Sequence, residues 1–352
     1  SLYSVVEFGE NKTARAAAKV WAKLKGVDNA RSIEKVWNSG DNIFPVRVER
    51  KYYQYLYKDD TGYNFMDNET FEQIEAMAKS GVEMTGTPTG FRDIDHLTSG
   101  LQPGNLVVIA GRPSMGKSAF ALGIAANLAL RKSTPVGVFT LEMSKLEVAQ
   151  RFMCAEGRVE LQRLRTGRLA DDDWSRLVKA CDALSKAPIY VDDTRLTTML
   201  EIRAKARRLK AREPGLGAII VDYLQLMSTG TTVENRVQEI AQISRALKVI
   251  AGDLEIPVIA LSQLNRGVES RTDKRPLLSD LRDSGAVEQD ADLVMFIYRD
   301  EYYNDNSEDQ GLAEVILAKH RNGPVGSEKL AFLSRFAKFA DLAPQHEARA
   351  AA

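Results

Sequence analysis

LVVIAGRPSMGKSAFALGIAANLAL, residues Leu106 to Leu130, is the stretch that decides the fold of this chain. An apolar run leads into a turn bounded by Gly111 and Gly116, and apolar residues at helical spacing follow. Strand, glycine-bounded turn and helix in this order are typical of a phosphate-binding loop. Backbone N–H groups and the helix dipole both favour an anion at such a helix start. We therefore expect this stretch to bind a nucleoside triphosphate.

Single residues of this loop have separate expected roles. Lys117 can place its charge on the β- and γ-phosphates, and the Ser118 hydroxyl can ligate Mg²⁺. The glycines let the backbone approach the phosphates where a Cβ would collide. The predicted nucleotide-binding residues are Gly111, Pro113, Ser114, Gly116, Lys117, Ser118 and Ala119. An ordinary glycine-rich turn between a strand and a helix is the alternative interpretation.

Composition limits the class of the protein. The 352 residues are 44% hydrophobic and 27% charged, which suits two domains, or one large and one small. Lys+Arg and Asp+Glu both total 48, so nucleic-acid binding would have to rest on a local patch. No apolar run reaches membrane length and no signal pattern begins the chain, so we expect a cytoplasmic protein without a membrane partner. Cys154 and Cys181 lack metal-type spacing and are expected to be buried, reduced thiols.

From residue 91 onward, apolar strands alternate with helical patterns. Strands are expected at Leu106–Ala110, Val136–Leu141, Ile189–Val191, Ala218–Val221, Pro257–Leu261 and Leu293–Tyr298, and helices at 116–131, 145–157, 171–186, 198–212 and 234–254. The runs of Val, Ile and Leu do not alternate with polar residues, which indicates strands buried on both faces. The expected fold is therefore α/β, a mainly parallel sheet with flanking helices. A hairpin of Ala313–Lys319 and Glu328–Leu333 is expected to follow.

Polar side chains end three of the expected strands. Asp222 ends IIVD, where it can hold Mg²⁺ or its water, although a simple cap is the alternative. Glu142 follows FTL, and because Ser144 and Glu147 can form the capping box of the next helix, Glu142 is left to deprotonate the attacking water. Gln263 ends ALSQ and can sense the γ-phosphate by hydrogen bonding, or it can be a plain polar strand end.

The stretch from Arg266 to Asp290 is locally basic. Its basic residues are Arg266, Arg271, Lys274, Arg275 and Arg282. A mobile basic loop beside a phosphate sensor suits contact with a nucleic-acid backbone. The stretch has no aromatic residue, so such contacts would be to phosphates and would carry little sequence specificity. A solvated loop without a ligand is the alternative.

Residues 71–345 resemble the C-terminal motor domain of bacterial replicative DNA helicases of the DnaB type, which has a RecA-like core. The matching strings are TGTPTGFRDIDHLTSGLQPGNLVVIAGRPSMGKSAFAL, FTLEMS, IIVDYLQLM, ALSQLNRGVE, KRPLLSDLRDSGAVEQDADLVMFIYRDEYY and KHRNGPVG. Their order and spacing fit as a series. The resemblance implies a homo-hexameric ring that hydrolyses ATP or another NTP with Mg²⁺ between subunits. It also implies translocation along single-stranded DNA in the 5′ to 3′ direction.

The same resemblance assigns roles to single residues. The catalytic residues it implies are Lys117, Glu142, Gln263, Lys319 and Arg321, the metal ligands are Ser118 and Asp222, and the DNA-contacting residues are Arg282, Asp283 and Gly285. Glu142 is the base and Gln263 the phosphate sensor. Lys319 and Arg321 of KHRNG extend to the phosphates of the neighbouring subunit, which couples hydrolysis to assembly.

Residues 1–74 have a different pattern, with short β-segments broken by GEN, DNA, NSGDN and DDTG. This spacing suits a small all-β barrel. The strings VVEF, AKLKG, IEKVWNSGD and QYLYKDDTGYNFMDNETFEQIE resemble the first domain of elongation factor P. In that family one hairpin carries a modified Lys or Arg, and Arg15 stands at that place. Because that family's second and third domains have no counterpart, a barrel kept as a module is favoured over translation-factor activity.

The two resemblances meet at residues 68–82, NETFEQIEAMAKSGV, which are expected to form an amphipathic helix similar to the DnaB-type linker helix. The expected domains are a barrel at 1–70, a linker helix and turn at 71–90, a RecA-like NTPase domain at 91–342 and a disordered tail at 343–352. The barrel stands in place of the helicase family's N-terminal helical domain, so primase and loader binding are not part of the expectation.

An ATP-driven, ring-forming DNA helicase motor is the leading hypothesis. A RecA-like repair or strand-exchange ATPase is an alternative, against which the spacing of DLRDSG and KHRNG argues. A translation-factor-like binding module with an inactive ATPase is another, against which the intact set of Lys117, Glu142, Asp222 and Arg321 argues.

Overall fold

The structure, a computed structural model, divides into two units, Ser1–Ser80 and Gly81–Ala352. It describes residues 3–11, 19–26, 32–38, 53–58, 63–67, 73–76 and 84–342, except 195–197, 225–226 and 228–235, and it does not describe the side chains before residue 84 or those of 282–284. The expectations for Arg15 and for the tail at 343–352 fall outside the described residues and stay predictions. The unit boundary lies within the stretch 71–90 that the sequence assigns to a linker.

The described part of the first unit consists of antiparallel strands. These are β1 (Tyr3–Asn11), β2 (Lys19–Gly26) and β3 (Ser32–Asn38) in one sheet, and β4 (Tyr53–Lys58), β5 (Tyr63–Asp67) and β6 (Gln73–Ala76) in another. An all-β segment was expected here. Closure of the strands into one barrel stays a prediction.

The helix predicted over residues 68–82 is wrong at Gln73–Ala76. Strand β6 occupies these residues and pairs antiparallel with β5, with Ile74 opposite Phe65. Polar and apolar residues alternate in Gln-Ile-Glu-Ala, which also suits a half-buried strand. Ladder hydrogen bonds and cross-strand pairs with β5 outweigh the helical spacing of the surrounding apolar residues.

Among the described residues of the second unit, nine strands form one sheet in the order β15-β14-β13-β12-β7-β11-β10-β8-β9. Their bounds are β7 (Leu106–Gly111), β8 (Val136–Thr140), β9 (Ile189–Asp192), β10 (Ala218–Asp222), β11 (Val258–Gln263), β12 (Leu293–Tyr298), β13 (Leu312–His320), β14 (Gly326–Leu333) and β15 (Lys338–Ala340). Neighbours from β12 to β9 are parallel, and β13, β14 and β15 join antiparallel at one edge. The mainly parallel sheet and the late hairpin are thus confirmed.

Helices lie between most of these strands. The α-helices are α1 (Arg92–Thr98), α2 (Lys117–Ala126), α3 (Lys145–Gly157), α4 (Leu161–Thr166), α5 (Asp171–Ser185), α6 (Met199–Arg212), α7 (Arg236–Leu254) and α8 (Gly285–Asp290). A π-helical turn, η1 (Asn127–Arg131), continues α2, and the 3-10 turns are η3 (Arg266–Ser270), η4 (Leu278–Ser284), η5 (Asp300–Tyr302) and η6 (Ser334–Phe336). The five long helices lie where the sequence predicts them. Helices α1 and α4 were not expected because six or seven residues show too little periodicity.

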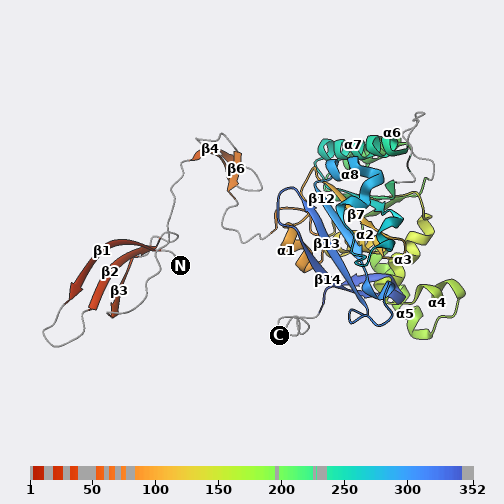
Figure 1. The fold of residues 1–352 in the computed structure, drawn as a ribbon, viewed down its shortest axis with the longest axis horizontal. Coiled ribbons are helices and arrows are strands. Elements are labelled where there is room, and N and C mark those ends of the chain that lie inside the picture. The colour runs from red at the N-terminus through yellow and green to blue at the C-terminus, as the bar shows by residue number, and fades with distance from the viewer. Residues whose placement is uncertain are drawn as a thin grey trace. The chain divides into compact units, whose positions relative to one another are not determined.

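The sheet separates two hydrophobic cores. Val107 and Ile109 of β7 pack into the core that includes Phe120 of α2, whereas Val108 packs into the core that includes Ile243 of α7. This alternation follows from the period of two along a strand. Figure 1 shows α6, α7 and α8 together at the top of this unit. The sheet is therefore covered on both faces, and its strand ends are the places where polar side chains can meet a ligand.

The two cysteines differ in exposure. Cys154 is buried in α3 as expected, whereas Cys181 is exposed, so the prediction of a buried thiol is wrong there. Cys181 follows the buried Ala180 on the amphipathic helix α5 and lies on its outward face. Among the described helices, none combines the length and apolar character needed to cross a membrane.

Candidate nucleotide site

The loop between β7 and α2 has the geometry of a phosphate cradle. Ser114 and Gly116 have φ angles of 66° and 102°, which lie in the left-handed region. A Cβ on Gly116 would lie 3.1 Å from the Phe339 ring and 3.3 Å from the Phe332 ring, so both backbone and packing require glycine. Within the described residues, no side chain caps the start of α2. Its first N–H groups are therefore available to an anion.

Lys117 lies over this loop. Its Nζ donates to the carbonyl oxygens of Gly111 (2.8 Å) and Arg112 (3.2 Å). Burial lowers the Lys117 pKa to about 8, while the carboxylates of Asp222 and Glu142 oppose that shift. The lysine thus faces both predicted acids, at the position from which it can move onto a phosphate.

Strand register brings the predicted residues to one edge of the sheet. Gln263 at the end of β11 pairs with Gly111 at the end of β7. Asp222 at the end of β10 pairs with Thr140 at the end of β8, and the exposed Glu142 follows two residues later. Because β7, β11, β10 and β8 are consecutive and parallel, their carboxyl ends line one edge. The loop, the predicted sensor Gln263, the predicted metal ligand Asp222 and the candidate base Glu142 lie along it.

Asp222 and Ser118 form a donor set that fits Mg²⁺. Asp222 is only 4% exposed, and burial raises its pKa to about 6, with the charge on Glu142 adding to the rise. The Ser118 hydroxyl hydrogen-bonds to this carboxylate and opposes the rise. Hydroxyl and carboxylate oxygens are hard ligands of the kind Mg²⁺ prefers. Ser118 and Asp222 would therefore hold the ion.

The helix after Glu142 is capped as the sequence predicts. Glu147 accepts hydrogen bonds from the Ser144 backbone N–H and hydroxyl, both at 2.9 Å, and its own N–H donates to Ser144 Oγ at 3.3 Å. Both halves of a capping box are present. Glu142 has no part in this cap, and its charge acts on Lys117 and Asp222 instead.

Lys319 and Arg321 lie at the other end of the parallel strands, where those strands begin. Arg321 donates through its backbone N–H to Asp292 O (2.8 Å) and through its guanidinium to Asp292 Oδ1 (3.2 Å). Lys319 Nζ donates to Glu288 O at 2.6 Å, and burial lowers the Lys319 pKa. Asp292 stands just before the start of β12 and is therefore at the amino ends of the parallel strands. The structure does not bring these two cations to the phosphate-binding loop of their own chain.

The basic stretch 266–290 is not an irregular loop, because it contains η3, η4 and α8. Its mobility stays a prediction, but two of its arginines are held in ion pairs. Arg271 donates to both oxygens of Asp280 (3.1 and 2.9 Å), and Arg275 donates to Glu314 at 2.9 Å. These ion pairs were not predicted from the sequence. Glu314 lies 39 residues after Arg275 in the chain, too far for a local pattern to indicate the contact. Gly285 begins α8, while the side chains of Arg282 and Asp283 lie outside the described residues.

Residues 86–341 match the family model described as DnaB-like helicase C terminal domain. The chain belongs to this family. This chain is 52% identical over 275 residues to "Replicative DNA helicase DnaB" of Geobacillus stearothermophilus, covering 78% of this chain and 60% of that protein. It is 50% identical over 275 residues to "Replicative DNA helicase DnaC" of Bacillus subtilis (strain 168), with the same shares. The chain thus spans about 60% of the length of these curated relatives.

Solved structures agree with this family and confirm the RecA-like fold. "ATPase Domain of G40P" superposes with a TM-score of 0.73 at 43% identity, covering 75% of this chain and 94% of that chain. "The Structure Of A DnaB-Like Replicative Helicase And Its Interactions With Primase" superposes with a TM-score of 0.72 at 43% identity, covering 74% of this chain and 62% of that chain. Residues 48–82 match the Elongation factor P (EF-P) OB domain, which confirms the resemblance of that part of the first unit.

Three charged residues of the DnaB-like domain were missed from sequence. Asp292 is 3% exposed, and its Oδ2 accepts from Leu106 N (2.8 Å) and Lys248 Nζ (2.5 Å). Arg112 is buried inside the loop motif, and Arg299 follows β12 and donates to Ser114 O at 3.1 Å. The Arg299 guanidinium also lies 4.2 Å from the Phe332 ring centroid. The sequence did contain a signal for them: Arg112 stands inside the loop motif, and Asp292 and Arg299 flank an apolar strand.

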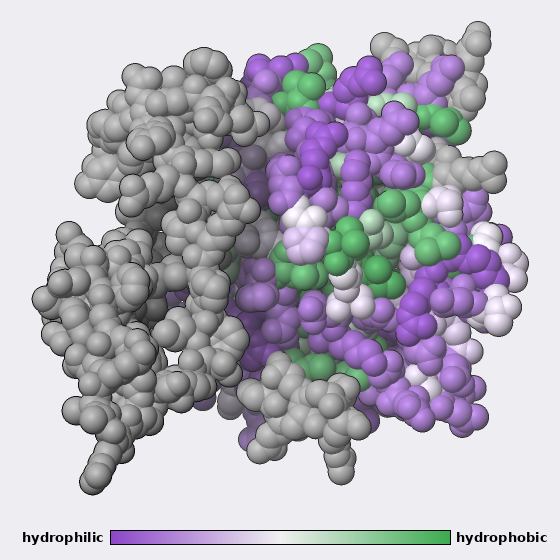
Figure 2. Space-filling view, turned by 60° about the vertical axis from the view of Figure 1, so that its left-hand side comes forward, coloured by the Kyte–Doolittle hydropathy of each residue, from purple (hydrophilic) through white to green (hydrophobic). Residues whose placement is uncertain are grey.

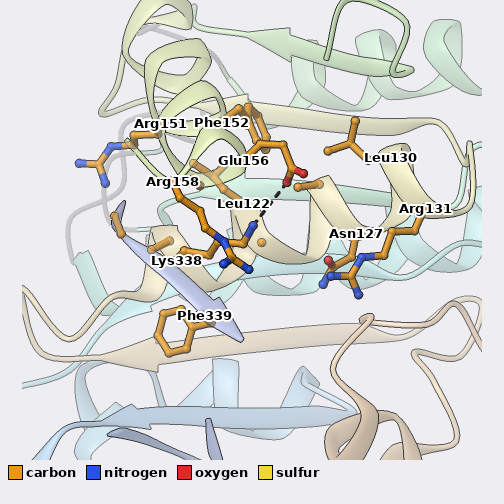
Figure 3. A pocket seen from close by; sticks show the side chains of 15 residues that line it. Leu122, Asn127, Leu130, Arg131, Arg151, Phe152, Glu156, Arg158, Lys338 and Phe339 are labelled. Atoms are coloured by element: carbon orange, nitrogen blue, oxygen red, sulfur yellow. Dashed lines mark hydrogen bonds and ion pairs between the residues drawn. The ribbon is translucent and has the colours of Figure 1, made fainter. Parts of the chain in front are cut away.

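A cavity of about 250 Å³ borders the DnaB-like site beyond Ala119 (Figure 3). Leu122, Phe152 and Phe339 contribute apolar lining, and Arg131, Arg151, Arg158 and Lys338 contribute positive charge. Lys338 Nζ lies 3.4 Å from Glu156 Oε2, the contact drawn as a dashed line. Ala119, predicted to bind nucleotide, lines this cavity directly after Ser118. The cavity thus has an apolar floor and a rim of four basic side chains and the acidic Glu156.

Proposed function

We propose that this chain is the ATP-hydrolysing motor of a hexameric replicative DNA helicase that translocates 5′ to 3′ on single-stranded DNA. The observation that carries the proposal is the division of the site between two edges of one sheet. Lys117, Asp222 and Glu142 gather at the carboxyl ends of the strands, whereas Lys319 and Arg321 lie at the amino ends. Subunits arranged head to tail in a ring would bring one edge against the other.

The chemistry at the carboxyl edge is phosphoryl transfer to water. Ser118 and Asp222 would hold Mg²⁺, which supplies positive charge against the phosphates. Lys117 would leave the Gly111 and Arg112 carbonyls to bind the β- and γ-phosphates. Glu142 is exposed beside the site and would take a proton from the attacking water. Gln263, at the strand end next to the loop, would hydrogen-bond the γ-phosphate.

The neighbouring subunit would complete the site with Arg321 and Lys319. The Arg321 side chain is 53% exposed although its guanidinium touches Asp292, so it can leave that partner for an incoming phosphate. Lys319 is held at the carbonyl end of α8 by its bonds to Glu288 and Gln289. A guanidinium supplied from outside makes hydrolysis depend on docking of the neighbour.

The face of the second unit shown in Figure 2 supports self-association. Hydrophobic residues gather in the middle of the visible part of that face, with hydrophilic residues above, below and to the right of them. Apolar patches rimmed by polar residues are typical of protein–protein contact surfaces.

DNA contact is proposed for Arg282, Asp283 and Gly285 in η4 and at the start of α8. A cytoplasmic location is part of the same proposal.

One experiment tests the whole proposal. ATP hydrolysis is measured with and without a single-stranded oligo-dT, and the oligomer mass is measured with and without nucleotide at the same protein concentration. We expect a mass six times that of the chain and faster hydrolysis when DNA is present. A monomer that hydrolyses ATP without any response to DNA would contradict the proposal and favour a simple ATPase.

A further inference from the structure

Contacts run without a break from the phosphate-binding loop to the helical turns that carry the predicted DNA-contacting residues. We propose that Glu269, through its ion pair with Arg112, is a positioning residue that transmits the nucleotide state of the loop to Leu278–Asp290. The inference rests on the proposed function, because it concerns how ATP and DNA act on each other. Neither Glu269 nor Arg112 has a role in the chemistry derived above.

The relay begins inside the loop at Arg112. Its backbone carbonyl accepts a hydrogen bond from Lys117 Nζ at 3.2 Å. Its side chain reaches the segment after β11, with Nε donating to Glu269 Oε1 and NH1 donating to Leu264 O, both at 2.9 Å. Arg112 thus joins the phosphate-binding lysine to the segment that follows the sensor strand β11.

The next contacts lead from that segment to η4. Asn265 N–H donates to Asp280 O at 3.2 Å, which ties the start of η3 to η4. The Asp280 carboxylate accepts from the Leu277 N–H at 2.7 Å and from Arg271 at 3.1 and 2.9 Å. A shift of η3 must therefore move η4 and, directly after it, α8.

Nucleotide binding disturbs the first contact of this series. When Lys117 moves onto a phosphate it gives up its bond to the Arg112 carbonyl, which still accepts from the Met115 N–H at 3.3 Å, so Arg112 stays tied to the loop and moves with it. The Arg112 side chain is 8% exposed and has little space to absorb that movement by itself. Glu269 is 43% exposed, so its carboxylate can release and rejoin Arg112. The relay requires two arrangements of this pair, one joined as in the structure and one released when nucleotide binds.

The first test follows amide hydrogen exchange without DNA. Exchange in Leu278–Asp290 is measured in the presence and absence of Mg²⁺ and a non-hydrolysable ATP analogue, for the wild type and for Glu269→Gln. Glu314→Gln is the control, because it removes the carboxylate that pairs with another arginine of the same stretch, Arg275. The contacts described for Arg275 are with Glu314, Asp273, Arg271 and Tyr298, and none of these residues belongs to the loop. We expect a nucleotide-dependent change in the wild type and the control, reduced at least by half in Glu269→Gln. An equal change in all three proteins, or none in the wild type, would overturn the relay.

The second test uses the DNA affinity. Coupling between two ligands is reciprocal, so the ratio of Kd values for oligo-dT with and without the ATP analogue measures it. We expect Glu269→Gln to bring that ratio towards one, while ATP affinity and DNA-free turnover stay within about twofold of wild type, because neither Glu269 nor Arg112 takes part in the proposed chemistry. A wild type that binds no DNA contradicts the proposed function. A wild type whose ratio is unchanged by Glu269→Gln contradicts only the relay.

Discussion

Lys117 and Arg321 lie towards opposite ends of strand β7. Lys117 follows the loop that leaves Gly111, whereas Arg321 binds Asp292, whose carboxylate also accepts the backbone N–H of Leu106. The strand between those ends rises by about 17 Å over its six residues, at about 3.3 Å per residue. One triphosphate cannot bridge that distance within a chain, so the two cations can share a substrate only across two chains.

Mixed rings test this division directly. Lys117→Ala and Arg321→Ala should each abolish most turnover, the second because about 10³–10⁵ of the rate depends on such an arginine. An equal mixture should regain about a quarter of wild-type activity, since about a quarter of head-to-tail contacts join two intact halves. The matched control mixes Lys117→Ala with Glu142→Gln, which damage the same half and should not rescue each other. No recovery in the first mixture, with mixed rings confirmed by mass, would remove the trans role.

Nucleotide affinity should fall at alkaline pH because Lys117 loses its proton early. Burial lowers its pKa from 10.5 to about 8, and only the charged form attracts phosphate. Affinity should therefore be complete below pH 8 and fall above it, by up to about tenfold per pH unit. The Kd of a fluorescent ATP analogue between pH 7 and 9.5 measures this. A constant Kd over that range would contradict the assignment.

Magnesium binding should weaken at mildly acidic pH. Burial raises the Asp222 pKa to about 6, so the carboxylate that would hold the ion is mostly charged above pH 6 and mostly neutral below it. The Mg²⁺ concentration for half-maximal hydrolysis should rise between pH 7.5 and 5.5, and Asp222→Asn should impair Mg²⁺ use at both values. A raised carboxyl pKa means that the charged form destabilises the fold above pH 6, so Asp222→Asn should keep its melting temperature. A loss of Tm would show that the variant fails for structural reasons.

Glu142 and Glu147 offer a matched pair for separating chemistry from folding. Glu142→Gln should bind ATP normally and lose about 10²–10⁴ in kcat, the usual contribution of a general base. Glu147→Gln makes the same change in the capping box, where an amide oxygen can still accept from Ser144, so turnover and Tm should stay near the wild-type values. Kd, kcat and Tm are measured for both variants. Comparable turnover in the two would remove Glu142 as the base.

The strands and the carboxyl-edge site were predictable because each is encoded locally. Residues 218–222 are an apolar run with an acid at its end, and burial on both faces leaves no other arrangement for such a run. The capping box of Ser144 and Glu147 likewise depends on four consecutive residues. Once parallel strands are expected, their carboxyl ends must share an edge, which places Asp222 and Gln263 beside the loop.

Features that depend on distant partners were not predictable. The sequence does not indicate that Arg275 pairs with Glu314, or that Arg112 pairs with Glu269, which lies 157 residues away. The segment around Ile74 has the spacing of a helix, but pairing with β5 makes it a strand. In each case the decisive contact comes from a part of the chain that local periodicity does not reach.

The central position of β7 has a consequence for how the chain folds. One side of β7 pairs with β11, and the other side can pair only after β12 has been synthesised. The hydrogen bond between Leu106 N–H and Asp292, at the start of the β7–β12 pair, joins residues 186 apart. Until Leu293–Tyr298 has left the ribosome, the apolar strand Leu106–Gly111 has an open edge that can pair with other chains. Late closure of such a contact slows folding. A nascent chain that ends before Leu293 is therefore expected to aggregate. Strand β12 thus has a second task, since its pairing with β7 covers the open edge of the strand that leads into the phosphate-binding loop.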